Sequence, residues 1–378
     1  MPRMTRGQYM EKKFVALGLM SGTSMDGIDV ALLETDGKNQ LVFGPHQTFS
    51  YSQEARNVLT QALEAAKSWQ AQDSIPDAVQ AASELITQTH LQAVASFVIS
   101  KGLTLDAIDV IGFHGQTVLH APDQGRTVQI GDGQALADGL GLNVVEQFRL
   151  ADVAAGGQGA PLSPLYHAAI AHQAGAEMPL AVLNLGGVGN VTFIGQDGEV
   201  LGFDTGPGNA LLDDWTGLKT GKPFDENGAL AESGTVDPDV LMALLDHPYF
   251  LKAPPKSLDR NAFSLMPCEA LSAADGAATL ATFTALSVAC AIPYFPQLPK
   301  AWVVCGGGRH NPVLVAALSE AVGERVRVAE AAAWPGDELE AQAFAWLAVR
   351  HILGLPSSLP SITGCRAPTV GGVLRKPR

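Results

Sequence analysis

Residues 17–29 read LGLMSGTSMDGID, a short apolar run that enters a turn of small and polar residues. We expect one strand before the turn (14–19) and a second after it (28–34), so the segment joins strand to strand rather than strand to helix as a P-loop does. Glycine lets backbone amides approach a ligand closely, hydroxyls add donors, and one carboxylate can face a metal ion. The turn therefore suits a polyphosphate with Mg²⁺, although the residues alone also permit a glycine-bearing hairpin without a ligand.

The size and charge of the chain exclude several classes of protein. Its 378 residues are 47% apolar, which is enough for a large core and too many for one compact domain, so we expect two domains. The formal net charge of −14 argues against nucleic acid as the main partner, because a phosphate footprint needs a basic face. An anionic ligand must therefore be held by local amides, a few cations or a metal ion.

Cysteine usage and hydropathy indicate the compartment. The four cysteines form neither a CxxC pair nor a His/Cys cluster, so we expect no zinc site and reduced thiols. The apolar run at 14–20 is too short for a signal peptide, and no stretch approaches about eighteen apolar residues. We therefore expect a cytoplasmic protein with no membrane partner.

The first half of the chain alternates strand and helix signals. Apolar spacing predicts helices within 52–100, interrupted near Pro76. A strand at 108–112 is expected to open into the HGQT segment at 114–117, followed by a strand at 127–131, a helix at 133–140 and a strand at 143–146. A glycine-rich loop then occupies 154–161.

The pattern restarts near residue 180. An apolar strand (179–185), a glycine turn (186–190), a strand (191–194) and an Asp-Gly turn (197–198) repeat the order found at 15–37. We infer two related lobes that each offer a glycine hairpin to a shared cleft, although two hairpins can also recur by chance in a glycine-rich chain. A strand at 301–305, the turn Gly306–Gly308 and a helix at 311–322 add a strand-to-helix site that suits an anion or nucleotide. A last helix is expected at 342–351.

Several segments are distinctive when they are taken together and in order. They read GLMSGTSMDGID (18–29), HGQT (114–117), DVAAGGQGAPL (152–162), LNLGGVGNVT (183–192), GFDTGPGNALLDDW (202–215) and CGGG (305–308). They resemble the 1,6-anhydro-N-acetylmuramic acid kinases of bacteria, which belong to the actin/sugar kinase/Hsp70 superfamily. The resemblance implies a two-lobed α/β fold with a duplicated core, a nucleotide cleft between the lobes, use of ATP and Mg²⁺, and a homodimer. We expect an N-terminal tail (1–13), an N-terminal lobe (14–150) and a C-terminal lobe (151–378), with the boundary somewhere in 145–180.

The implied reaction converts 1,6-anhydro-N-acetylmuramic acid to N-acetylmuramic acid 6-phosphate during recycling of peptidoglycan fragments. Because O6 of the anhydro sugar is tied to C1, a base must activate water to attack C1 while O6 takes up the γ-phosphoryl group. The family motif implies that Asp204 is this base, in a tight turn made by the glycines around it. The residues alone also allow Asp204 to cap a helix that begins near Asn209.

The resemblance also implies the nucleotide contacts. The contacts expected in the hairpin at 186–190 and in the turn at 306–308 rest on analogy with the superfamily. Asp26 is expected to place Mg²⁺ through water, although it can also cap its own turn. The expected nucleotide-binding residues are Ser21, Gly22, Thr23, Ser24, Met25, Asp26, Gly27 and Ile28 at the phosphates, Gly186, Gly187 and Asn190 in the opposing hairpin, and Gly306, Gly307 and Gly308 at the adenosine.

The sugar needs many directional hydrogen bonds, and its lactyl carboxylate needs a donor or a cation. The expected sugar-binding residues are His114, Gln116, Thr117, Arg149, Asp152, Gly157, Gln158, Gly206 and Asn209. Each of them can instead be a satisfied structural group. Many members of the resembled family have a further arginine shortly after the one that matches Arg149, where this chain has Leu150 and Ala151.

Two other functions compete with this interpretation. A nucleotide switch of the same superfamily would share the phosphate hairpins and would turn over ATP slowly without sugar. A conventional amino-sugar kinase would prefer a sugar with an open hydroxyl to the anhydro form. A serine hydrolase is a poor third candidate, because Ser24 lacks the GxSxG context.

Overall fold

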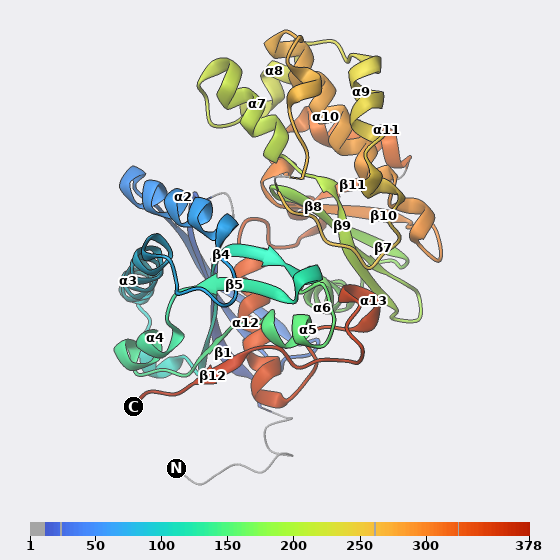
Figure 1. The fold of residues 1–378 in the computed structure, drawn as a ribbon. Helices are drawn as coiled ribbons and strands as arrows, with labels where there is room; N and C mark the ends of the chain where they lie inside the picture. Colours follow the sequence, from blue (N-terminus) through green and yellow to red (C-terminus); the bar gives the residue numbers. More distant parts are fainter. Residues whose placement is uncertain (1–11, 23–24, 261, 324) are drawn as a thin grey trace. The chain divides into compact units, whose positions relative to one another are not determined.

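The computed structural model describes residues 12–22, 25–260, 262–323 and 325–378, so the expected tail lies almost entirely outside the described residues (Figure 1). The chain divides into two compact units. Unit 1 comprises Met1–Ala174 and Glu338–Arg378, and unit 2 comprises Gly175–Asp337. The first break falls inside the expected boundary region. The return of the C-terminal segment to unit 1, by contrast, was not part of the expected division.

Unit 1 is built on a mixed sheet of order β12-β6-β4-β1-β2-β3, with β5 paired to β4. Strand β1 is parallel to β4, and β4 is parallel to β6, whereas the β1–β2 and β2–β3 pairs are antiparallel. The strands are β1 (Phe14–Ser21), β2 (Gly27–Thr35), β3 (Leu41–Ser50), β4 (Val110–Ala121), β5 (Arg126–Ile130), β6 (Val144–Glu146) and β12 (Val373–Arg375). The helices are α2 (Gln53–Ser68), α3 (Asp77–Ser100), α4 (Gly133–Leu140), α5 (Leu150–Ala154), α6 (Pro164–Gln173), α12 (Leu339–Leu353) and α13 (Pro360–Thr363).

Local signals account for most of the helix boundaries in unit 1. Ser52 caps α2 by accepting a hydrogen bond from the backbone N–H of Ala55. Asp132 caps α4, and Gly141 ends it in the left-handed conformation with φ 68°. The expected helices within 52–100 and at 133–140 are confirmed.

Helix α12 joins unit 1 because it packs directly on the strands β1 and β4 (Figure 1). A Cβ atom at Gly18 of β1 would collide with the backbone carbonyl of Ala341, and one at Gly112 of β4 would collide with that of Phe344. Two glycines in neighbouring strands therefore let the helix backbone approach the sheet more closely than any side chain would allow. Helical periodicity predicted α12 itself, but not the sheet on which it lies.

Unit 2 repeats the core of unit 1 with the order β11-β10-β7-β8-β9. Strand β7 pairs with β8 antiparallel and with β10 parallel, as β1 does with β2 and β4. The strands are β7 (Leu180–Leu185), β8 (Val188–Ile194), β9 (Val200–Pro207), β10 (Ala301–Cys305) and β11 (Arg325–Val328). The helices are α7 (Ala210–Thr220), α8 (Ala229–Glu232), α9 (Pro238–Leu245), α10 (Ala273–Ala289) and α11 (Pro312–Val322). The inferred duplication is confirmed by strand order and strand direction.

The core of unit 2 includes a helix that is apolar enough to cross a membrane by length and composition. It spans Ala273–Tyr294, has a mean hydropathy of 1.5 in its most apolar window, and is 67% buried over that window. The expectation that no stretch approaches this limit was therefore wrong. The apolar side chains belong to the core, where Leu280 and Phe283 are fully buried. All four cysteines are in the thiol form.

Three expected boundaries differ from the structure. The HGQT segment lies within β4 rather than after it, because β5 pairs with the second half of that strand. Asp204 lies inside β9 rather than in a turn, and Asn190 lies on β8. Strand β3 was not expected, since it is an edge strand whose exposed positions lack a clean apolar alternation.

Candidate functional site

The β1–β2 hairpin of unit 1 carries the small and polar residues that were expected at the phosphates. Met25 has a positive φ of 55°, and its N–H donates to the carbonyl of Gly22 at 3.2 Å. Gly27 opens β2, where a Cβ atom would press on the backbone of Phe49. The side chain of Asp26 is exposed, and its backbone carbonyl accepts a hydrogen bond from Tyr51 N–H at 3.0 Å. Thr23 and Ser24 lie outside the described residues.

Gln116 supports this hairpin from the neighbouring strand β4. Its buried carboxamide accepts a hydrogen bond from the Ser21 hydroxyl at 2.5 Å and donates one to the carbonyl of Gly22 at 3.1 Å. The hydroxyl of Tyr51 donates to Ser21 Oγ at 3.1 Å, and burial raises the pKa of Tyr51 to about 12. Gln116 was expected at the sugar, but the structure brings it to the candidate phosphate hairpin.

His114 and Arg149 form a second polar group in unit 1. His114 Nδ1 donates to the carbonyl of Gly115 at 2.7 Å, so its Nε2 is the acceptor for Arg149 at 3.1 Å and 3.3 Å. Burial, and then the charge of Arg149, holds the pKa of His114 well below its usual value. Arg149 also donates to the carbonyl of Gly159 at 2.7 Å. A neutral histidine thus orients a guanidinium, which suits recognition of a carboxylate.

Asp152 ties the glycine-rich loop to α13. It is almost fully buried, and its carboxylate accepts hydrogen bonds from Gly159 N–H at 2.7 Å and from the Thr363 hydroxyl at 2.6 Å. A Cβ atom at Gly157 would collide with this carboxylate. The backbone N–H of Gln158 donates to the carbonyl of Thr363 at 2.7 Å. The contacts of Asp152 therefore shape the loop, and sequence reasoning missed Thr363 because it lies far along the chain.

Two other residues that were expected at the sugar have protein neighbours. The Thr117 hydroxyl accepts a hydrogen bond from Gln129 Nε2 at 3.2 Å. Gly206, in unit 2, lies against α10, where a Cβ atom would come within 2.8 Å of the Ser287 side chain. These contacts with other residues of the protein explain both positions structurally, so neither residue by itself indicates a ligand.

The β7–β8 hairpin of unit 2 packs against the start of α7. The carbonyl of Gly186 accepts from Asn209 N–H at 2.9 Å, and that of Gly187 accepts from Gly208 N–H at 2.9 Å. The side chain of Arg260 lies close to Gly187, and a Cβ atom added to this glycine would be 3.7 Å from Arg260 Nε. Sequence reasoning missed this arginine. A partly exposed cation therefore lies beside the second glycine hairpin, where a phosphate can be bound.

A row of polar side chains crosses the sheet of unit 2. Cys305 pairs with Asn184, Asn184 pairs with Asn190, and Asn190 pairs with Asp204. Residues that are paired across neighbouring strands project from the same face of a sheet. The buried Oδ1 atoms of Asn190 and Asn209 have no hydrogen-bond partner among the residues that the structure describes. Such atoms call for a water or a ligand.

Asp204 is held firmly by its surroundings. Its side chain is 6% exposed, and Oδ2 accepts a hydrogen bond from Leu258 N–H at 2.8 Å. Its backbone N–H donates to the carbonyl of Lys256 at 3.0 Å, and its backbone carbonyl accepts from the Tyr249 hydroxyl at 2.5 Å. The β8–β9 pairing shifts beside Asp204, as bulges near active sites often do. Asp204 does not cap α7, which begins after Asn209.

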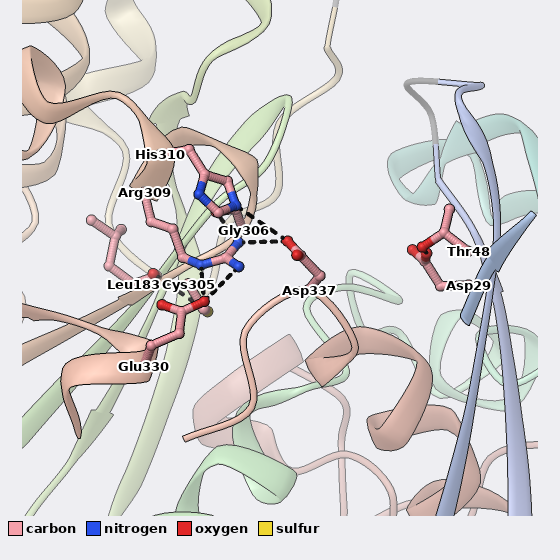
Figure 2. Close-up of polar contacts among 9 residues, drawn as sticks. All are labelled: Asp29, Thr48, Leu183, Cys305, Gly306, Arg309, His310, Glu330 and Asp337. Carbon is pink, nitrogen blue, oxygen red and sulfur yellow. Dashed lines mark hydrogen bonds and ion pairs between the residues drawn. The ribbon is translucent and has the colours of Figure 1, made fainter. Parts of the chain in front are cut away.

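Arg309 and His310, which directly follow the glycine turn after β10, line a cavity of about 450 Å³ in unit 2. The cavity is lined by Asn227, Arg309, His310, Pro312, Val315, Ala316 and Val328. Arg309 is buried and donates to Glu330 at 2.7 Å and 2.9 Å, to Asp337 at 2.8 Å and to the carbonyl of Gly306 at 3.0 Å (Figure 2). These bonds fix Arg309 at one wall of a partly apolar cavity.

The described residues contain no group of three or more histidines, cysteines or acidic residues that could hold a metal ion. Asp29, which lies on β2 just after the turn of the first hairpin, accepts a hydrogen bond from the Thr48 hydroxyl at 2.6 Å (Figure 2). Asp26, whose side chain is exposed, is the carboxylate that the sequence predicts to place Mg²⁺. Mg²⁺ commonly binds through one or two carboxylates, several waters and the substrate phosphates, and a single carboxylate beside a phosphate hairpin fits that mode.

The repeated sheet order, with a glycine-containing hairpin at the first strand of each sheet, defines an α/β protein with a duplicated core. A family model described as anhydro-N-acetylmuramic acid kinase matches residues 14–376. The chain therefore belongs to the anhydro-N-acetylmuramic acid kinase family.

Relatives with that name agree over almost their whole length. One from Paramagnetospirillum magneticum is 52% identical over 361 residues, covering 95% of this chain and 98% of its own. One from Methylobacterium nodulans is 49% identical, with 96% and 100% covered. Among solved structures, a (R)-2-hydroxyglutaryl-CoA dehydratase component A from Acidaminococcus fermentans has a TM-score of 0.47 at 11% identity, covering 89% of this chain and 98% of that chain, which adds nothing to the family assignment.

Proposed function

We propose that this chain is an ATP-dependent kinase that opens the 1,6-anhydro ring of 1,6-anhydro-N-acetylmuramic acid with water and phosphorylates O6, giving N-acetylmuramic acid 6-phosphate and ADP. Membership of the family over residues 14–376 supports the substrate class. The single observation that carries the mechanism is the buried carboxylate of Asp204 beside the unsatisfied Oδ1 of Asn190. A base and an acceptor on one sheet face can hold a water for attack on a carbon atom.

In the proposed mechanism, Asp204 takes the proton of the water that attacks C1. The C1–O6 bond breaks, and O6 takes the γ-phosphoryl group of ATP, so no free sugar hydroxyl is required. Breaking an acetal while transferring phosphate requires that water, sugar and ATP are aligned precisely. The hydrogen bonds that hold Asp204 and the glycine hairpins in place serve this alignment. The oriented guanidinium of Arg149 supplies the cation that the lactyl carboxylate needs.

The nucleotide contacts follow from the glycine turns of both units. In unit 1, Ser21, Gly22 and Gly27 would bind phosphate oxygens. In unit 2, we propose the same role for Gly186, Gly187 and Arg260. Asp26 would hold Mg²⁺ through water, and the ion would neutralise charge on the transferring phosphoryl group. The cavity beside Gly306–Gly308 would take the adenosine.

We further propose that the protein acts in the cytoplasm as a homodimer, on fragments released during peptidoglycan recycling. Both alternatives make different demands on the substrate. A nucleotide switch requires no sugar for its slow ATP turnover, and a conventional kinase prefers N-acetylmuramic acid to the anhydro form.

In the deciding experiment, the protein receives ATP and Mg²⁺ with either the anhydro sugar or N-acetylmuramic acid, in ¹⁸O-labelled water. The mass of the product is then measured by mass spectrometry. We expect turnover with the anhydro sugar and one ¹⁸O atom at C1 of the product. Preference for N-acetylmuramic acid would favour the conventional kinase. ATP hydrolysis at the same rate with and without sugar would favour the switch.

A further inference from the structure

A segment outside the regular sheet forms hydrogen bonds with Asp204 on β9, the edge strand of the sheet in unit 2. Residues 254–260 run beside β9, where Lys256 supplies the carbonyl that accepts from Asp204 N–H and Leu258 supplies the N–H that binds Asp204 Oδ2. The position of the carboxylate therefore depends on how this segment is anchored. Sequence reasoning assigned no role to it.

The anchor is the side chain of Lys256, which is only 6% exposed. Lysine is almost never fully buried unless it is paired. Within the described residues Lys256 forms no ion pair; its Nζ donates to the carbonyl of Tyr249 at 3.3 Å. The ammonium lies 4.5 Å from the ring centroid of Tyr249, 5.3 Å from that of Tyr294 and 6.0 Å from that of Phe203.

This aromatic cage only partly offsets the cost of burying a charge. Cation–π contacts stabilise a desolvated ammonium by about 2 kcal/mol, whereas removing a charge from water costs several times more. An apolar side chain would fill the same space without that cost. A buried cation that is not paired for stability is a candidate for a functional role.

The charged and titratable groups around the ammonium point to what that role is. Burial lowers the pKa of Lys256, the negative charge of Asp204 acts in the opposite direction, and Lys252 acts with burial; the thiol of Cys290 also lies nearby. Asp204 is the single carboxylate among these groups, and attraction between two charges favours the ionised form of both partners. The titratable or charged groups that face the cage are Asp204 on β9, Tyr249 and Lys252 at the Pro248–Leu251 turn, Cys290 after α10, and Tyr294.

We propose that Lys256 is a positioning residue for Asp204: its caged ammonium anchors the 254–260 segment against β9 and keeps the carboxylate ionised. The proposal rests on the proposed role of Asp204 as the base. Lys256 does not touch the sugar or ATP in this scheme. It acts through the carboxylate, and Tyr249 completes the link by binding both the backbone of Asp204 and the ammonium.

The test is the pH dependence of kcat for the full chain, its Lys256→Met variant, its Lys256→Arg variant and the control Lys252→Met. Methionine keeps the apolar volume and removes the charge, arginine keeps the charge, and Lys252 is an exposed lysine four residues before Lys256. We expect the acid limb of the Lys256→Met profile to move upward by about one pH unit, a tenfold loss of rate on that limb. Lys256→Arg and Lys252→Met should keep the limb of the unmodified protein.

Each other outcome contradicts the proposal. If Lys256→Met lowers kcat equally at every pH, its role is structural. If Lys256→Arg shifts the limb as methionine does, the shape of the cage matters rather than its charge. Should Lys256→Met not fold, Lys256→Gln replaces it, and failure of both to fold would assign Lys256 to the core. Absence of any turnover of the anhydro sugar by the unmodified protein would instead refute the proposed function.

Discussion

Replacement of Gln116 by leucine tests whether this residue serves the phosphate hairpin or the sugar. Leucine fills nearly the same buried space but removes the carboxamide that binds the Ser21 hydroxyl at 2.5 Å and the Gly22 carbonyl at 3.1 Å. Ser21 keeps its bond from the Tyr51 hydroxyl, and the Gly22 carbonyl keeps its bond from Met25 N–H. The turn of the hairpin should therefore lose these two side-chain bonds to β4, while the backbone pairing of β1 with β4 stays intact.

The size of the effect follows from the two lost hydrogen bonds. Each contributes about 1 kcal/mol, so the ordered hairpin loses about 2 kcal/mol relative to its disordered alternatives. If the hairpin binds the phosphates of ATP, this loss corresponds to an increase of about 30-fold in the dissociation constant for ATP. The KM for the anhydro sugar should change little.

The assay is calorimetric titration with a non-hydrolysable ATP analogue, together with the KM for each substrate. A matched control is Gln173→Leu, which also removes two hydrogen bonds from unit 1, to Leu41 N–H at 2.6 Å and to its carbonyl at 2.8 Å, on a different strand. The control should bind ATP normally. A rise in the sugar KM with unchanged ATP affinity would refute the reasoning and return Gln116 to the sugar.

Three further changes test other parts of the site. Asp204→Asn should lower kcat by about 10²–10⁴-fold and leave ATP binding by calorimetry intact, and a near-normal rate would remove Asp204 from its role as the base. Gly208→Ala forces a Cβ atom onto the Gly186 carbonyl, so the free energy of unfolding in urea should fall by about 1–3 kcal/mol, while Gly217→Ala in the exposed part of α7 should be neutral or stabilising. Burial chiefly raises the pKa of Asp213 to about 7, so the folded protein keeps a proton that the unfolded chain releases near pH 4. This contribution to stability is complete below about pH 4 and lost as the pH rises through 7, by up to about 1.4 kcal/mol per pH unit, and urea titrations of Asp213→Asn should lack that slope.

The sequence by itself determined the elements whose signals are local. Glycine turns between apolar strands predicted both hairpins, and the helix predicted at 133–140 matches α4. Repetition of strand, turn and strand predicted the duplication that the sheet orders confirm. The family motifs then supplied the roles, since no spacing rule makes Asp204 a base.

Only the tertiary structure decided which distant residues meet. Gln116 lies at the hairpin because β4 runs parallel to β1, and α12 joins unit 1 because Gly18 and Gly112 open a groove for its backbone. Lys256 reaches Asp204 through hydrogen bonds that span about fifty positions of sequence, which no local pattern encodes. Periodicity and turn chemistry act over a few residues, whereas the packing and hydrogen bonding that shape a site are fixed only once the whole sheet has formed.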